Sequence, residues 1–286
     1  MQCLQFNEGT SHAGTTDSNV ERRRKLSMKK YMKFKIATTA ITVLALLFCT
    51  THLPVEAKRD KEYVAKQIRN IKIDGKLNEW ERAEIVAFDE LKDVGGGIPK
   101  ASDFTGQGRV AWSAQEPTRI YFAVEITDDE LQDVNPPDAR WWEDDSVEFM
   151  FDFDNGMVRD SLVQWTLGAN GKDLSAAASK QNTEWVLIKD GNDYIYEVAI
   201  DPTKPRGNPQ FANPGVGDKF KAEHGLTIGL SFHMNDCENG KREHQIGWIP
   251  GGAWDGLAYG DLTFDDEILS VEPSGKLAVV WGALKQ

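Results

Sequence analysis

The chain has 286 residues, of which 40% are hydrophobic and 27% are charged, a composition typical of a globular protein. Its formal net charge of −12 argues against binding to nucleic-acid phosphates or to anionic membranes. The three cysteines, Cys3, Cys49 and Cys237, show neither CxxC pairing nor metal-ligand spacing, which excludes a disulfide framework and a cysteine zinc site.

Residues 1–57 have the pattern of an N-terminal extension followed by a secretory signal peptide. A strongly basic segment over 22–35 precedes an uncharged apolar stretch over 36–48, and small residues precede a predicted cleavage site after Ala57. Because the apolar stretch is too short for a comfortable membrane span, we expect export to the periplasm, the cell surface or the medium. The alternatives are an uncleaved anchor, a lipoprotein modified at Cys49, and a translation start at Met28 or Met32 instead of Met1.

The mature chain is predicted to begin with a linker and to continue as a single module. Residues 58–67 are rich in charge and are expected to form the linker, and the module is expected to span 68–265. Apolar residues over 77–83 have near-helical spacing and predict one helical turn. Residues 93–108 contain many glycines and few apolar residues, which predicts a loop. Residues 266–286 are expected to form a C-terminal tail.

In several segments every second residue is apolar, and this period-two pattern predicts antiparallel strands with one buried face. No long amphipathic helix and no tandem repeat is evident in the mature chain. We therefore expect an all-β fold, an antiparallel, jelly-roll-like β-sandwich of two packed sheets. The alternating segments are 110–112, 120–127, 146–153, 162–167, 194–200 and 226–234.

Two tryptophans and a row of carboxylates stand at the start of one predicted strand, over 141–148. If the phenylalanines over 149–153 face the core, Glu148 must face solvent or a cleft, because successive strand residues alternate. Gln164 lies on the corresponding face of the next strand, and Trp254 is flanked by glycines on a loop. Sugars stack their C–H faces on aromatic rings and need polar partners for their hydroxyls. The pattern therefore predicts a sugar-binding face with two aromatic walls.

The sequence resembles carbohydrate-binding module family 9 from about Ile71 to Phe264, through short motifs in matching order and spacing. The resemblance implies a β-sandwich that holds a sugar, often the reducing end of a glycan, between two tryptophans. The motifs are Ile73-Asp74-Gly75-Lys76-Leu77-Asn78-Glu79-Trp80, Ile120-Tyr121-Phe122-Ala123-Val124 with Asp128, Trp142-Glu143-Asp144-Asp145-Ser146-Val147-Glu148, Met234-Asn235-Asp236 with Trp248, and Trp254 with Tyr259-Gly260-Asp261-Leu262.

The resemblance assigns a role to each candidate site residue. Trp142, with Trp141 as its alternative, and Trp254 would be the walls, Glu148 would accept hydrogen bonds from sugar hydroxyls, and Gln164 would donate and accept. Two polar partners of the family are missing. Residues 167–170 lack its arginine, and Gly-Gly-Ala stands before Trp254 where the family has an amide.

The resemblance also implies structural calcium, although no cofactor is expected to be required. Asp128, Asp152 and Asp154 offer the oxygen donors that calcium prefers, on strand ends and loops. Asp129 and Asn155 are further donors in the same segments, and none of these residues has EF-hand spacing.

Other functions are weighed against the sugar-binding module, whose expected partner is a carbohydrate in polysaccharide recognition or catabolism. An enzyme would use two carboxylates as acid and as base or nucleophile, so a glycoside hydrolase or its accessory protein is the enzymatic alternative. No GxSxG or HExxH motif is present. A haem-binding sandwich is a second alternative, with His224, His233, Met234 and His244 as candidate iron ligands. His233 and Met234 are adjacent on a predicted strand and point to opposite faces, so they cannot both reach one iron.

A surface module that binds another protein through the same tryptophans is the third alternative.

Overall fold

The computed structural model describes residues 59–269, with gaps at 93, 95, 116–117, 135–139, 209–212 and 214, together with Lys25, Leu26 and Met28. The chain divides into two units, Met1–Ala57 and Lys58–Gln286. The predicted signal-peptide cleavage site and residues 270–286 of the predicted tail lie outside the described residues. Among the described residues, no helix has the length and apolar character that a membrane crossing demands.

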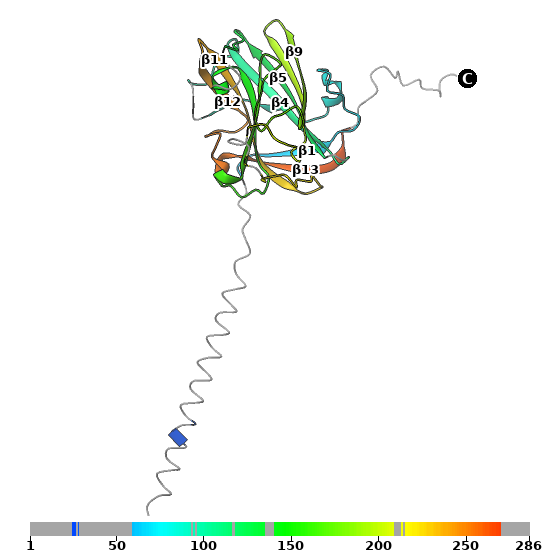
Figure 1. Ribbon diagram of the computed structural model, residues 1–286, viewed down its shortest axis with the longest axis vertical. Helices are drawn as coiled ribbons and strands as arrows, with labels where there is room; N and C mark the ends of the chain where they lie inside the picture. The colour runs from blue at the N-terminus through cyan, green and yellow to red at the C-terminus, as the bar shows by residue number, and fades with distance from the viewer. Residues whose placement is uncertain are drawn as a thin grey trace, which may run out of the picture. The chain divides into compact units, whose positions relative to one another are not determined.

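The second unit is built from strands joined into one hydrogen-bonded sheet (Figure 1). The order along the sheet is β8-β7-β6-β11-β13-β1-β4-β5-β10-β9. Off this path, β12 pairs with β11, β3 pairs with β12, and β2 pairs with β4. The strands are β1 Glu62–Gln67, β2 Val86–Ala87, β3 Glu90–Leu91, β4 Phe104–Ser113, β5 Arg119–Asp128, β6 Ser146–Asp152, β7 Leu162–Gly168, β8 Leu174–Ala176, β9 Thr183–Asp190, β10 Asp193–Ile200, β11 Thr227–Glu238, β12 Lys241–Gly247 and β13 Gly260–Ile268.

The two halves of this sheet face each other as the layers of a β-sandwich. Phe122 on β5 lies far along the sheet from β6 and β11, yet its ring centroid is 4.2 Å from that of Phe149 and 5.3 Å from that of Phe232. The predicted phenylalanine row over 149–153 is therefore core. The predicted all-β sandwich is confirmed, and its pairing is antiparallel except that β1 pairs in parallel with β13 and β4.

The predicted linker over 58–67 is wrong, because most of this segment belongs to the sheet. Glu62–Gln67 form β1 between β13 and β4, where Tyr63 and Ala65 are buried. Arg59 is only 4% exposed. The charged residues of this segment suggested a linker, but in β1 they alternate with buried residues, and the strand connects the two layers. The loop predicted over 93–108 ends earlier than expected, since β4 begins at Phe104.

The predicted helical turn is present as the 3-10 helix η1, Leu77–Trp80, which lies on the outer face of the β4–β5–β10 layer. Trp80 is fully buried there beside Ala111, Tyr121 and Ala199. Its indole Nε1 donates to Glu197 Oε1 at 3.0 Å. The segment around η1 therefore covers a sheet face that would otherwise expose apolar residues.

Glu197 on β10 holds this cover in place. Its Oε2 accepts hydrogen bonds from the backbone N–H groups of Asp74 and Gly75, each at 2.8 Å. Burial raises the pKa of this carboxyl, and the bonds from Trp80, Gly75 and Asp74 partly offset that rise. Asp74, Gly75 and Trp80, which belong to one sequence motif, therefore all donate hydrogen bonds to the buried carboxylate of Glu197.

Replacing Glu197 with alanine should destabilise the protein by about 2–4 kcal/mol, because three donors lose their acceptor in a buried place. Urea unfolding measures the change. Glu184→Ala is the matched control, since Glu184 pairs with Arg119 at the surface, and such pairs contribute at most about 1 kcal/mol. Equal losses in the two variants would contradict the role assigned to Glu197.

Candidate functional site

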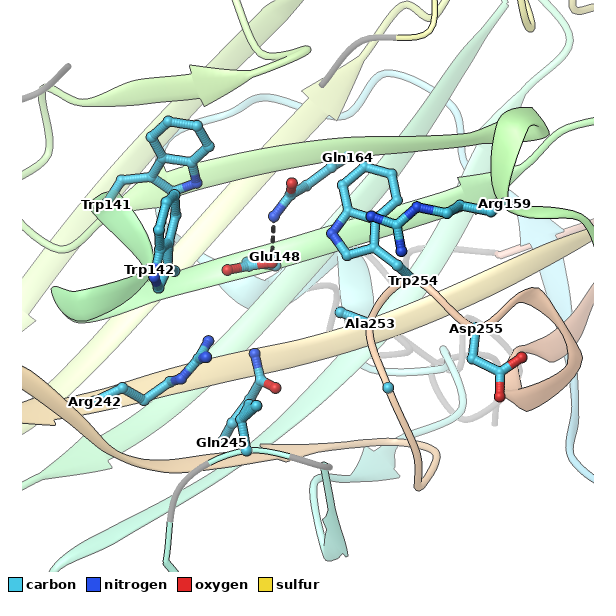
Figure 2. Close-up of a pocket in the computed structure, with 12 residues that line it drawn as sticks. Trp141, Trp142, Glu148, Arg159, Gln164, Arg242, Gln245, Ala253, Trp254 and Asp255 are labelled. Atoms are coloured by element: carbon cyan, nitrogen blue, oxygen red, sulfur yellow. Dashed lines mark hydrogen bonds between the residues drawn. The ribbon is translucent and has the colours of Figure 1, made fainter. Parts of the chain in front are cut away.

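A cleft of about 480 Å³ opens on the outer face of the layer that contains β7, β6, β11 and β12. It brings together all four residues that the sequence singled out as sugar ligands (Figure 2). The lining residues are Val94, Trp141, Trp142, Glu148, Arg159, Gln164, Arg242, Gln245, Gly252, Ala253, Trp254 and Asp255.

Aromatic rings stand on two opposite sides of the cleft. Trp141 and Trp142 belong to the 3-10 helix η2, Trp141–Glu143, and their ring centroids are 5.1 Å apart in an edge-to-face arrangement. Trp254 lies on the loop that precedes the 3-10 helix η4, Gly256–Ala258. Figure 2 shows Trp142 and Trp254 on either side of Glu148. All three tryptophans are partly exposed, as side chains that receive a ligand must be.

Glu148 on β6 forms the floor between the walls, and it is only 2% exposed. Its Oε2 accepts hydrogen bonds from Gln164 Nε2 at 2.6 Å and from His233 Nε2 at 3.1 Å. Its Oε1 accepts one from Asn235 Nδ2 at 2.6 Å. A carboxylate has about four acceptor positions, so one position of Oε1 stays available to a ligand.

The hydrogen-bond network fixes the charges of the floor. Burial alone would raise the pKa of Glu148, but the bonds from His233, Asn235 and Gln164 lower it, so Glu148 is ionised. Burial lowers the pKa of His233, which is therefore neutral near pH 7 and donates from Nε2. Its Nδ1 lies 3.3 Å from Ser231 Oγ, which itself accepts from the buried Lys92. A buried chain of donors thus ends at the Glu148 carboxylate.

Asn235 on β11 connects the floor to the next strand. While its Nδ2 donates to Glu148, its Oδ1 accepts from Arg242 Nη1 at 3.1 Å and from Gln245 Nε2 at 2.7 Å. Arg242 and Gln245 lie on β12 and line the cleft, and neither was predicted as a site residue. They supply a guanidinium and an amide at the site, the two groups that the family resemblance implies near Gln164 and Trp254 and that the sequence lacks there.

A bulge in β12 explains why period-two reasoning cannot find this pair. Residues 242 and 245 are an odd number of positions apart, so in a regular strand they would face opposite sides. The register shifts between Asp236 and Cys237, where Asp236 pairs with His244 and Cys237 pairs with Arg242. Glu243 is the extra residue, and both side chains consequently face the cleft.

The Trp254 side of the cleft is held by a buried ion pair. Arg59 Nη2 donates to Asp152 Oδ2 at 2.7 Å and to the Gly256 carbonyl at 3.2 Å, so it connects β6 to η4. Asp152 also accepts from Met157 N at 2.8 Å and from Ser161 Oγ at 2.8 Å. Met157 precedes the 3-10 helix η3, Arg159–Ser161, and Ser161 ends it. This helix carries Arg159 over the Trp254 ring at 5.1 Å.

The predicted calcium set is not brought together. Asp152 is ion-paired with Arg59, and Asp154 is exposed and accepts from the Gly156 backbone. Asp128 lies instead beside Asp145, at the other end of β6, about 20 Å from Asp152 by the rise of a strand. The prediction was wrong because alternation shows which face a residue occupies, and not which strand ends meet.

A different carboxylate cluster fits a cation. Oxygens of Asp128, Asp145 and Asp236 lie within 4.8 Å of one another, and all three residues are buried. Burial and the neighbouring carboxylates raise the pKa of Asp128 to about 6, of Asp145 to about 9 and of Asp236 to about 8. Asp128 and Asp145 accept backbone N–H bonds, whereas no described donor reaches the Asp236 carboxylate. Like charges this close need a bound cation or protons.

The haem ligands considered from the sequence have other partners. Met234 packs in the hydrophobic core, as predicted, while His233 on the opposite face is fully buried instead of lying on an open polar face. Both ring nitrogens of His233 are engaged, with Glu148 and Ser231. His224 lies beside Asp266 at the surface, and His244 contacts the Gly97 carbonyl.

The fold and the cleft define a β-sandwich binding module with an aromatic-walled site. The model of the family described as carbohydrate family 9 binding domain-like matches residues 73–265, and the chain belongs to this family. No curated protein matches the sequence.

Two solved structures of a family 9 carbohydrate-binding module from Caldicellulosiruptor kristjanssonii share this fold, each with a TM-score of 0.56 and 15% identity. One is in complex with cellotriose, and its alignment covers 72% of this chain and 95% of that chain. The other is in complex with glucose, with 74% and 100% covered.

Replacing Arg59 with methionine should lower the free energy of unfolding by about 3–5 kcal/mol, because it leaves Asp152 charged and buried without its guanidinium. Urea unfolding measures the loss, and hydrogen exchange should rise first over 153–161 and 252–258. Arg119→Met, which breaks a surface pair, is the control. Unchanged exchange in these two segments would show that Arg59 does not hold the Trp254 wall.

Proposed function

We propose that this chain is an exported, non-catalytic carbohydrate-binding module that holds a sugar between Trp142 and Trp254. The observation that carries the proposal is the cleft itself, in which two aromatic walls flank a floor of ionised carboxylate and amide. The complexes of the structurally similar modules with cellotriose and glucose support a carbohydrate as the ligand class. Export is supported by the basic segment and the apolar stretch that precede Ala57.

The chemistry of the cleft suits a sugar ring. Its C–H faces stack on the indoles of Trp142 and Trp254, which removes apolar area from water. A hydroxyl at the ring edge donates to the remaining position of Glu148 Oε1. Gln164 donates one amide hydrogen to Glu148, so its second hydrogen and its carbonyl oxygen are available to a neighbouring hydroxyl.

The protonation state of the floor favours binding over hydrolysis. A glycosidase needs a carboxylic acid whose pKa is raised, so that it can protonate the leaving oxygen. The pKa of Glu148 is instead lowered by its three donors. The other carboxylate that lines the cleft, Asp255, is exposed and caps η4 by accepting from Leu257 N. Glu148 therefore lacks the environment of a general acid.

We further propose that Asp128, Asp145 and Asp236 bind a calcium ion with a structural role. Oxygen donors from carboxylates are the ligands that calcium prefers, and the unpartnered Asp236 carboxylate points to a cation in the cluster. Asp145 lies two residues after η2, and its Oδ1 accepts from the Cys237 backbone at 2.7 Å. A cation there would neutralise the cluster and stabilise the segment that carries Trp142.

Trp142→Ala and Trp254→Ala should each weaken binding of glucose and cellotriose by at least about tenfold, because each removes one stacking wall. Isothermal titration calorimetry measures the affinities, and circular dichroism checks that the variants fold. Trp141→Ala discriminates between the two tryptophans of η2, and Trp185→Phe, on β9, is the control outside the cleft. The proposal fails if both alanine variants bind like the unchanged protein, or if the latter binds no sugar.

Calcium should raise the midpoint of thermal unfolding, and a chelator should reverse the effect. Asp236→Asn should abolish this response while raising the midpoint in chelator, because it removes one of three repelling carboxylates. Asp154→Asn, which alters an exposed carboxylate outside the cluster, should keep the response. A calcium response that survives Asp236→Asn would place the ion elsewhere.

A further inference from the structure

Two arginines line the cleft without a carboxylate partner. Arg242 is half-buried on β12, and Arg159 is exposed on η3. In the part of the chain that the structure describes, Arg242 donates to the amide oxygen of Asn235, and Arg159 lies over the ring of Trp254. Neither guanidinium forms an ion pair with a described aspartate or glutamate.

Several arginines outside the cleft do have carboxylate partners. The chain has 45 acidic and 33 basic residues, so carboxylates are abundant. The ion-paired arginines outside the cleft include Arg59 with Asp152, Arg109 with Glu125, Arg119 with Glu184, Arg140 with Glu143, and Arg206 with Asp218. The two cleft arginines differ from these, because they line the cleft together with the carboxylates of Glu148 and Asp255 and form an ion pair with neither.

The cleft carboxylates do not neutralise Arg242. Glu148 takes its donors from Gln164, His233 and Asn235, and none from Arg242. Figure 2 shows the Asp255 carboxylate turned away from Glu148, and the guanidinium of Arg242 turned toward the centre of the cleft beside Gln245. A guanidinium has five N–H donors, and Arg242 uses one of them on Asn235.

We propose that the cleft selects a sugar that bears a carboxylate, a uronic acid, and that Arg242 binds this carboxylate. The inference rests on the proposed sugar-binding function of the same cleft. Gln164 lies on one side of Glu148, and Arg242 with Gln245 lies on the other (Figure 2). A ring between Trp142 and Trp254 thus presents one edge to Gln164 and the opposite edge to Arg242.

The chemistry of the guanidinium explains why a carboxylate suits it better than a hydroxyl. Its planar fork matches the two oxygens of a carboxylate with two parallel hydrogen bonds. A neutral hexose would offer the guanidinium only hydroxyls, so the positive charge would have no opposite charge with which to pair. Arg242 is the binding residue because it is half-buried and oriented by Asn235, and a charge pair is stronger away from bulk water. Arg159 packs on Trp254 and adds positive potential at the rim.

The test compares three ligands that differ at one carbon: glucose, glucuronate and the neutral methyl ester of glucuronic acid. Isothermal titration calorimetry on the purified protein should show glucuronate bound about tenfold more tightly than the other two, with a preference that shrinks as salt rises. Arg242→Gln should lower the affinity for glucuronate about tenfold more than the affinity for glucose. Arg119→Gln, on the other layer, should leave the preference intact.

The outcomes separate this inference from the function on which it rests. If glucose is bound but glucuronate is bound no more tightly than its methyl ester, the uronic-acid inference is overturned and the sugar-binding function stands. An equal loss for all three ligands in Arg242→Gln would likewise overturn the role of Arg242. If the unchanged protein binds none of the three ligands and no cellotriose, the proposed function itself fails.

Discussion

A carboxylate can be buried only if hydrogen-bond donors, a cation or a proton compensate for its lost hydration. The segment around β6 carries three such groups, since Asp145, Glu148 and Asp152 are 3%, 2% and 0% exposed. Each is compensated differently, and each compensation builds one part of the cleft. Asp152 has Arg59, Glu148 has an imidazole and two amides, and Asp145 has backbone donors within a carboxylate cluster.

These requirements couple segments that are far apart in the chain. The floor forms only if β7, β6, β11 and β12 keep their register, because the donors to Glu148 and to Asn235 come from different strands. The Trp254 wall depends on Arg59, which reaches the Gly256 carbonyl from the first residues of the module. Gly229 on β11 leaves the room for it, since a Cβ there would lie 2.3 Å from the Arg59 guanidinium. The site is therefore preorganised by buried polar contacts rather than by its aromatic rings.

The sequence predicted the parts of the fold and of the site that depend on alternation. The core row over 149–153, the cleft position of Glu148 and Gln164, and the loop position of Trp254 follow from strand periodicity and from glycine neighbours. Side chains alternate along a regular strand, so once the residues that face the core are known, the residues that face outward are known too. This is why a short aromatic and acidic motif sufficed to locate the walls and the floor.

Residues whose position depends on pairing between distant segments escaped prediction. Arg59 looked like part of a charged linker, because its partner Asp152 lies 93 positions later. Arg242 and Gln245 share a face only through the bulge at Glu243, which depends on the register with β11. The aspartates around the two ends of β6 looked equivalent as metal ligands. They differ because one end receives an arginine and the other receives two more carboxylates.

Charge is distributed over this module in a way that a single net value conceals. Among the described residues, one end of β6 brings three buried carboxylates together, and the cleft holds two arginines that form no ion pair. Unpaired charge of either sign is costly where water is partly excluded, so each region has a thermodynamic reason to bind an ion of opposite sign. For the carboxylate cluster we propose a metal cation. For the cleft we propose a sugar ring that carries a carboxylate, because such a ligand also fits between two indoles.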